Sequence, residues 1–498
     1  MNLGRMAVLG LSCTGALTAW AGEAITQPWN PEFHADRRAR VLEQMPAGSV
    51  AVLSSGRLQN RNGDLDHEFR QDSDFYYLTG FEEPDSMLAL VRGDGAGTPD
   101  RVIFFVLPKN YLAELWTGAR VGVEGAKLVY GATDAYPVDQ AEDELRALLM
   151  KTATIFHSFG SNATMDTLIF DVLKNRGATT LGSGLEFRDL RAVTHELRLI
   201  KTPIEIERMQ RAIDITGEAI AEIRALADAG VLAGLSESHV DGLLAFGYQK
   251  RGVVRDGFPS IVAAGGNATV LHYSPGVALA LEEDLLLLDI GAEWGYYSAD
   301  VTRTLPVRGG AIGDLPAGVE AGSPAALRAE AQASIYRAVL AAQEAAIREV
   351  RPEVSYKLLS SVAEEELRGA LWRLGLMTEK GATWQLRVWY THGLGHWVGL
   401  DVHDAGSYRG ADGRQRKFEP GMVLTVEPGL YISRASLDHA GELARARGFE
   451  VTDEEIAAFQ AAVRPLVEGV YDGIGVRLED DVLVTEDGHR VLSGAIPK

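Results

Sequence analysis

The sequence is almost free of cysteine, because Cys13 is the only one among 498 residues. A disulfide within the chain is therefore impossible, and so are zinc or iron–sulfur sites built from cysteine. Basic residues are also few, 48 against 69 acidic ones, which gives a net charge of -21. Nucleic-acid recognition needs a basic footprint, so this balance argues against a nucleic-acid binder. The mean hydropathy of -0.03 excludes a polytopic membrane protein.

What remains is the composition of an ordinary globular protein. Hydrophobic residues make up 46% and charged residues 23% of the chain, which excludes a disordered chain. The length predicts about two to four domains. The chain has 11 histidines, so any metal site must be built from His, Asp and Glu.

The first 21 residues have the pattern of a signal peptide. Arg5 precedes an apolar stretch without acidic residues, which ends in the small-x-small sequence Ala19-Trp20-Ala21. The stretch is short for a membrane span. A buried N-terminal helix and a lipoprotein anchored through Cys13 are the alternatives. We expect cleavage after Ala21, a bacterial periplasmic or secreted protein, and no membrane attachment once the leader is removed.

The rest of the chain predicts two domains. Residues 22–195 alternate helical patterns with short apolar runs, which indicates an α/β domain. Thr202-Pro203 then has the pattern of a helix start, and residues 196–498 combine long helices with β-hairpins, which favours an α+β domain. Residues 309–325 and 434–470 lack strong strand patterning and read as insertions.

Two acidic residues belong to a predicted hairpin, LLLLDIGAEWGYYSADVTRT, at residues 285–304. A carboxylate after four leucines is costly unless it is paired or binds a cation. A turn at Trp294-Gly295 would set Asp289 directly opposite Asp300, with β-carbons about 4.5–5.5 Å apart. A surface hairpin with unremarkable acids is the alternative, and the leucine run disfavours it.

Three histidines and two glutamates extend this set. His392, His396 and His403 lie within HGLGHWVGLDVHD, whose glycines indicate a loop or a close backbone approach. Glu427 follows the apolar strand of VLTVEPGLY, and Glu479 lies in GIGVRLEDD, two residues after Arg477. A lone His or a strand-terminal Glu is usually structural, but the group as a whole indicates a site.

This group of side chains suits a centre with two divalent ions. Carboxylates can bridge two such ions about 3.5–4 Å apart, as in two-metal hydrolases. Hard oxygen ligands with one imidazole favour manganese, cobalt or zinc. A neighbouring Glu or His can then handle the protons of the reaction.

The chain resembles the pita-bread metallopeptidases and, within them, the aminopeptidase P (Xaa-Pro aminopeptidase) family. The resemblance covers most of the chain after the leader. It rests on the four motifs above and on GNATVLHY at residues 266–273 in the second domain. In the first domain and the connection it rests on FRQDSDFYYLTGFEEPDS (69–86), AELWTG (113–118) and HELRLIKTPIEIE (195–207). It implies an α/β N-terminal domain followed by an α+β pita-bread catalytic domain.

The resemblance also implies roles for individual residues. The metal ligands would be Asp289, Asp300, His396, Glu427 and Glu479, with Asp300 and Glu479 bridging two ions that are usually manganese. Glu427 would also handle protons. The remaining catalytic and substrate-side residues would be His272, His403, His392, Arg477, Tyr431 and Trp116, the last in a motif that reaches a neighbouring subunit in some members.

The implied reaction is hydrolysis of the bond between an N-terminal residue and a following proline, within a homo-oligomer such as a dimer or tetramer. Prolidase, which cuts Xaa-Pro dipeptides, and its relatives that hydrolyse organophosphorus esters use the same ligands. A non-catalytic binding module is an alternative of another class, but such proteins lack acidic ligands that are present here. The stretch 434–470 is long for a compact member, so an overhang above the cleft is one expectation for it.

Overall fold

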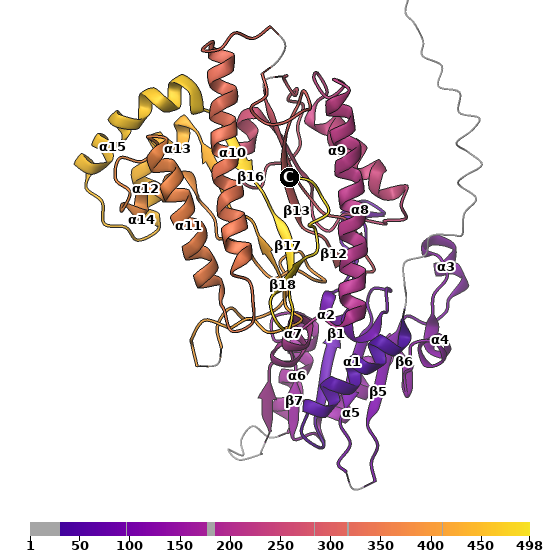
Figure 1. The fold of residues 1–498 in the computed structure, drawn as a ribbon. Helices are drawn as coiled ribbons and strands as arrows, with labels where there is room; N and C mark the ends of the chain where they lie inside the picture. Colours follow the sequence, from indigo (N-terminus) through magenta and orange to yellow (C-terminus); the bar gives the residue numbers. More distant parts are fainter. Residues whose placement is uncertain (1–29, 96, 177–184, 283, 316–317, 411) are drawn as a thin grey trace, which may run out of the picture.

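The structure is a computed structural model that describes residues 30–498 except 96, 177–184, 283, 316–317 and 411. The expected signal peptide, residues 1–21, lies outside the described residues. Among the described helices none is both long and apolar enough to cross a membrane. The chain forms an N-terminal domain below a larger domain of long helices and strands (Figure 1).

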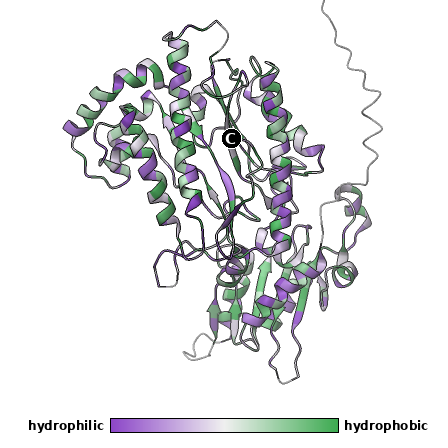
Figure 2. Ribbon diagram, in the orientation of Figure 1, coloured by the Kyte–Doolittle hydropathy of each residue, from purple (hydrophilic) through white to green (hydrophobic). Residues whose placement is uncertain are grey.

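The N-terminal domain is built on a six-stranded mixed sheet with helices on both faces. Alternate residues of its central strand point to opposite cores: Ala51 and Leu53 join one hydrophobic cluster, Val50 and Val52 another. The strand order is β6 (Asp134–Pro137), β5 (Arg101–Val106), β4 (Met87–Val91), β1 (Val50–Ser54), β7 (Thr154–Phe156) and β8 (Glu186–Arg188). A small hairpin, β2 (Asn60–Asn62) and β3 (Leu65–Asp66), lies apart from this sheet. Figure 2 shows the hydrophobic character of the sheet strands.

Several helices of this domain begin at a side-chain cap. Asn30 caps the first helix by accepting a hydrogen bond from Phe33 N, with Pro31 at its first position. The helices are α1 (Pro31–Gln44), α2 (Ser73–Thr79), α3 (Tyr111–Thr117), α4 (Gly122–Leu128), α5 (Ala141–Leu149), α6 (Ala163–Asn175) and α7 (Arg191–Leu199). Helix α7 runs past residue 195, and α8 begins at Pro203 after a capping box of Thr202 and Glu205.

In the second domain, strands lie between two pairs of helices (Figure 1). One pair is α8 (Pro203–Asp228) with α9 (Glu237–Gln249), and the other is α10 (Pro324–Arg348) with α11 (Tyr356–Arg373). The strands are β9 (Ile261–Ala264), β10 (Leu285–Ile290), β11 (Glu293–Trp294), β12 (Tyr297–Ser298), β13 (Val301–Pro306), β14 (Val423–Val426), β15 (Gly429–Ile432), β16 (Ile474–Arg477), β17 (Asp480–Val484) and β18 (His489–Val491). They form the ladders β13-β10-β9, β14-β17-β18, β11-β12 and β15-β16. The short 3-10 helix η2 (Gly265–Thr269) follows β9.

The long insertion is helical and packs against α12. It forms α13 (Arg434–Asp438), α14 (Ala440–Ala446) and α15 (Asp453–Leu466), and ends in the π-helical turn η3 (Val467–Tyr471). Phe459 of α15 packs against Trp384 and Trp389 of α12 (Thr383–Trp389), with ring centroids 5.1 and 6.2 Å apart. The insertion contributes no residue to the lining of the large pocket described below, so the expected overhang is not seen.

The predicted hairpin register was wrong. Trp294 pairs with Tyr297 and Asp289 pairs with Thr302, so the turn residues are Gly295 and Tyr296. Both have positive φ, 57° and 70°, as the favoured two-residue hairpin turn requires. The turn therefore lies one residue later than predicted, and Asp300 is not directly opposite Asp289.

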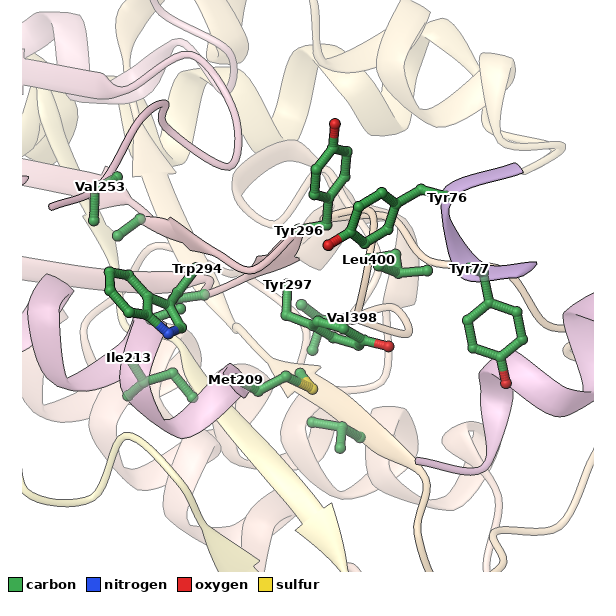
Figure 3. Close-up of a cluster of buried hydrophobic side chains, with 14 of the residues drawn as sticks. Tyr76, Tyr77, Met209, Ile213, Val253, Trp294, Tyr296, Tyr297, Val398 and Leu400 are labelled. Carbon is green, nitrogen blue, oxygen red and sulfur yellow. The ribbon is translucent and has the colours of Figure 1, made fainter. Parts of the chain in front are cut away.

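The tip of this hairpin joins the two domains. Tyr296 stacks on Tyr76 of α2, with ring centroids 3.5 Å apart and ring planes at 15° (Figure 3). The guanidinium groups of Arg70 and Arg255 lie 5.3 and 4.9 Å from the centre of the Tyr296 ring. The same hydrophobic cluster includes Phe75 of the N-terminal domain and Ile213 of α8, so one core crosses the domain junction.

A buried histidine of α1 makes stability depend on pH. Only 1% of His34 is exposed, its Nδ1 lies 3.0 Å from Tyr77 O, and burial lowers its pKa from 6.5 to about 3. Between these values the unfolded chain binds a proton that the folded chain does not, so this contribution to stability falls as pH drops below 6.5.

We expect His34→Asn to flatten the acid limb of the stability curve by about 1.4 kcal/mol per pH unit, one proton's worth. Denaturant unfolding of both proteins at several pH values between neutrality and mild acid measures this difference. Parallel curves for the two proteins would contradict the assignment.

Candidate metal centre

Four carboxylates and an imidazole converge from separate strand ends. Asp289 lies in β10, Asp300 directly before β13, Glu427 directly after β14, and Glu479 directly before β17. The four acids therefore lie at or next to the ends of strands, as the sequence predicts. His396 comes from the loop before β14, where its backbone N–H donates to Thr425 Oγ1 at 3.0 Å.

The tightest grouping is Asp300, His396 and Glu479, whose ligand atoms all lie within 4.8 Å of one another. His396 Nε2 is 3.3 Å from Asp300 Oδ2 and 3.4 Å from Glu427 Oε1. Thr302 Oγ1 donates to Glu479 Oε2 at 2.7 Å and orients that carboxylate. The geometry thus connects four of the five predicted ligands directly.

Asp289 joins the group through an arginine. Its Oδ2 accepts a hydrogen bond from Arg477 Nη2, whereas its Oδ1 is buried and has no hydrogen-bond partner among the described residues. An unpartnered buried carboxylate oxygen is costly unless a cation neutralises it. Together with the oxygen-rich donor set, this fits a divalent cation.

The electrostatics of the acids lead to the same conclusion. Burial, followed by the charges of Asp289 and Asp481, raises the pKa of Asp300 well above its usual range. Burial and the charges of Asp300 and Glu427 do the same to the pKa of Glu479. Acids that repel each other this strongly in a buried pocket are stabilised by a bound cation.

These ligands line a pocket of about 710 Å³. The predicted substrate-side histidines His272, His392 and His403 and the predicted Arg477 also line it. Its remaining wall is largely apolar and includes Phe258, Pro259, Ile261, Leu271 and Val402. Nearly all the predicted site residues are therefore brought together in one cavity.

Two predicted residues stand outside the lining. Tyr431 is buried behind it, where its hydroxyl contacts His392 Nε2 and Arg477 Nη1, both at 2.8 Å. Trp116 lies on α3 of the N-terminal domain, is 87% exposed, and is not part of the pocket in the single chain.

Several residues that hold the site were missed from the sequence. Asp481 Oδ2 accepts from the backbone N–H of Asp300 at 3.0 Å, and burial raises the pKa of Asp481 to about 8. The sequence does contain a signal for Asp481, because residues 479–481 are three consecutive acids in an apolar segment. Only Glu479 was chosen from these three.

The loop that carries His403 is held by ion pairs from the domain junction. Lys201 Nζ binds Asp404 at 2.9 Å, and Arg198 Nη2 binds Asp404 and Asp401 at 2.6 and 2.7 Å. Burial alone would raise the pKa of Asp404, but these two cations lower it to about 2. The two aspartates that flank His403 are thus fixed from outside the pocket.

Comparisons with known proteins agree with this arrangement. The model of metallopeptidase family M24 matches residues 207–486, and that of the aminopeptidase P N-terminal domain matches residues 34–156. The chain belongs to metallopeptidase family M24. Its fold is accordingly the aminopeptidase P N-terminal domain followed by the pita-bread catalytic domain, which confirms the fold class predicted from the sequence.

Relatives match this M24 chain over nearly its whole length. Xaa-Pro aminopeptidase of Escherichia coli is 33% identical over 471 residues, 93% of this chain and 94% of that protein. The Haemophilus influenzae Xaa-Pro aminopeptidase is 34% identical, with the same coverage. The solved structure of Pseudomonas aeruginosa aminopeptidase PepP has a TM-score of 0.77 at 32% identity, covering 95% of this chain and 97% of that one.

Proposed function

We propose that this chain is an Xaa-Pro aminopeptidase, which removes the N-terminal residue of a peptide whose second residue is proline. The observation that carries the proposal is the convergence of five ligand-type side chains and three histidines in one 710 Å³ pocket of an M24 chain. The apolar part of the lining suits a proline ring, which has no N–H to satisfy.

The residues that would hold two divalent ions are Asp289, Asp300, His396, Glu427 and Glu479. Manganese is the proposed metal, and cobalt and zinc are the alternatives that the same donors accept. When bound, such ions supply Lewis acidity and lower the pKa of water. The steps below concern only the side chains of the protein.

A series of hydrogen bonds sets the tautomer of His392. Its Nδ1 donates to Gly393 O at 2.7 Å, which leaves Nε2 to accept from the Tyr431 hydroxyl, and Arg477 donates to that hydroxyl. Burial and the charge of Arg477 lower the pKa of His392 to about 3. His392 is therefore neutral and presents an uncharged ring to the substrate.

Glu427 and His403 are suited to the chemical step. Burial raises the pKa of Glu427, so its carboxylate can take a proton from the attacking water and give it to the departing proline nitrogen. Burial and nearby His396 lower the pKa of His403, which keeps it neutral. One ring N–H of His403 can then donate to the carbonyl oxygen as negative charge develops there.

A peptide panel tests the activity. With added manganese, we expect turnover of Xaa-Pro peptides of three residues and more, and weak or no turnover when alanine replaces the proline. Strong hydrolysis of Xaa-Pro dipeptides without hydrolysis of a tripeptide such as Arg-Pro-Pro would indicate prolidase instead. Metal analysis of the purified protein, with reconstitution by manganese, cobalt or zinc after chelation, tests the choice of metal.

The assembly and location of the protein are further parts of the proposal. Helix α3 exposes four apolar side chains, from 63 to 87% accessible: Tyr111, Leu112, Leu115 and Trp116. We propose that a second copy of the chain covers these side chains. The mass of the assembly, measured by sedimentation, tests this. The leader pattern of residues 1–21 supports a periplasmic or secreted protein, which cell fractionation and N-terminal sequencing would test.

A further inference from the structure

His272 belongs to a part of the chain with little regular structure. The His272 segment, defined as residues 264–276, begins at the last residue of β9, continues as the short helix η2 and then has no regular structure. His272 is exposed at the pocket and, within the described part of the protein, its ring makes no hydrogen bond. Its position therefore depends on how the segment around it is held.

A buried glutamate of the neighbouring helix holds this segment on both sides of His272. Glu237 is 1% exposed, and its Oε1 accepts from Ala264 N at 2.9 Å and from Asn267 Nδ2 at 2.8 Å. Its Oε2 accepts from the Tyr273 hydroxyl at 2.7 Å and from Gly276 N at 3.2 Å. One carboxylate thus gathers four donors that span the segment from end to end.

Among the described residues, these four hydrogen bonds are the main interactions of the Glu237 carboxylate. No described lysine or arginine forms an ion pair with it, so the donors and the N-terminal end of the 13-residue helix α9 stabilise its charge. It is not needed to cap the helix, because Ser236 and His239 already form the capping box.

The backbone beside Glu237 adds a second attachment. Ser238 donates to Gly276 O through its backbone N–H at 3.0 Å and through its hydroxyl at 2.8 Å. Glu237 N donates to Ala278 O at 3.0 Å. The first turn of α9 is therefore a fixed base to which the segment is tied, and the Glu237 side chain reaches across that segment.

We propose that Glu237 is a positioning residue of the reaction, which fixes the His272 segment and so sets His272 against the substrate. This rests on the proposed function, in which His272 contacts the peptide. Tyr273 is the nearest link, since its hydroxyl joins Glu237 and Asn267 while its side chain lines the pocket next to His272.

Glu237→Gln tests the proposal with little change of shape. The amide has one acceptor oxygen in place of two, so two of the four donors lose their acceptor. We expect kcat/KM for an Xaa-Pro tripeptide to fall about tenfold, mainly through KM, because a displaced contact residue weakens binding. The metal content is expected to match that of the wild type.

A double-mutant cycle separates positioning from general destabilisation. In a His272→Ala background, Glu237→Gln is expected to change kcat/KM by less than about twofold, because its effect passes through His272. Glu205→Gln is the matched control, since Glu205 is equally buried in the first turn of α8 but binds Arg37 and Tyr297. It is expected to lower the melting temperature while kcat/KM stays within about twofold.

Either of two results would overturn the proposal: wild-type kcat/KM in Glu237→Gln, or an equal loss in both backgrounds. If Glu237→Gln does not fold, Tyr273→Phe carries the test, with an expected loss of about threefold that disappears in the His272→Ala background. A loss of the same size in both backgrounds would again overturn it. A wild-type protein that cleaves no Xaa-Pro peptide counts against the proposed function itself, and is seen before any variant is compared.

Discussion

Asp300→Ala is expected to abolish both the binding of divalent metal and the hydrolysis of Xaa-Pro peptides, while the chain stays folded. Asp300 is central to the ligand group. Its Oδ2 lies 3.3 Å from His396 Nε2, and the ligand atoms of Asp300, His396 and Glu479 all lie within 4.8 Å of one another. Losing several kcal/mol of metal-derived transition-state stabilisation lowers the rate about a thousandfold or more.

The fold should tolerate this change for an electrostatic reason. Without metal, burial and the neighbouring Asp289, Asp481 and Glu427 disfavour the charged form of Asp300 and raise its pKa, so removing its carboxyl group takes away a buried acid that the site disfavours. The unfolding free energy of metal-free Asp300→Ala is therefore expected to equal or exceed that of the metal-free wild type.

Metal content by elemental analysis and kcat/KM on a tripeptide measure the two effects. Asp256→Ala is the matched control, because Asp256 is a partly buried acid of the same domain, with a pKa raised by burial to about 6, that does not line the pocket. It is expected to keep both metal and activity. Wild-type metal content in Asp300→Ala would refute the ligand assignment.

The acids of the candidate site were predictable because their signals are local, whereas the choice of His396 among three histidines came from the family resemblance. A carboxylate at the end of an apolar run, such as Asp289 after four leucines, is costly without a cation wherever the strand lies in the fold. The start of α8 was likewise predictable from two adjacent residues, Thr202 and Pro203. Such features need no knowledge of what packs against them.

The parts that sequence reasoning missed depend on contacts between distant residues. Asp300 and Asp481 are 181 positions apart, and Glu237 meets Ala264 across 27 positions. No periodicity or spacing relates these pairs. The predicted hairpin register was wrong for another reason, since the turn requires positive φ at Tyr296, which residues other than glycine rarely adopt.

The insertion illustrates the same limit. Its lack of strand patterning was visible in the sequence, but the surface against which it packs was not, because that depends on contacts between Phe459 and two tryptophans of α12. Trp116 differs from the insertion, because its motif identified it in the sequence but its side chain is exposed in the single chain. Its assignment to the substrate depends on a second subunit, which the sequence of one chain does not describe.

The second large prediction concerns a buried arginine at the domain junction. Arg198 of α7 is 4% exposed and binds Asp74, Asp401 and Asp404 at 2.9, 2.7 and 2.6 Å. Asp74 belongs to the N-terminal domain, and the other two flank His403 in the catalytic domain. Arg198→Ala removes one of the two cations that compensate buried Asp404 and leaves only Lys201 beside it, and breaking a buried ion pair costs about 3–5 kcal/mol.

We therefore expect Arg198→Ala to lower the free energy of unfolding by about 3–5 kcal/mol. Arg191→Ala is the control on the same helix, since Arg191 pairs with Asp189 at the surface, where both side chains are 45% exposed. Its expected cost is about 1 kcal/mol or less. Denaturant unfolding compares the two variants, and similar costs would mean that the buried network does not hold the domains together. A large loss for Arg198→Ala alone would show that the ion pairs of Arg198 stabilise the domain junction.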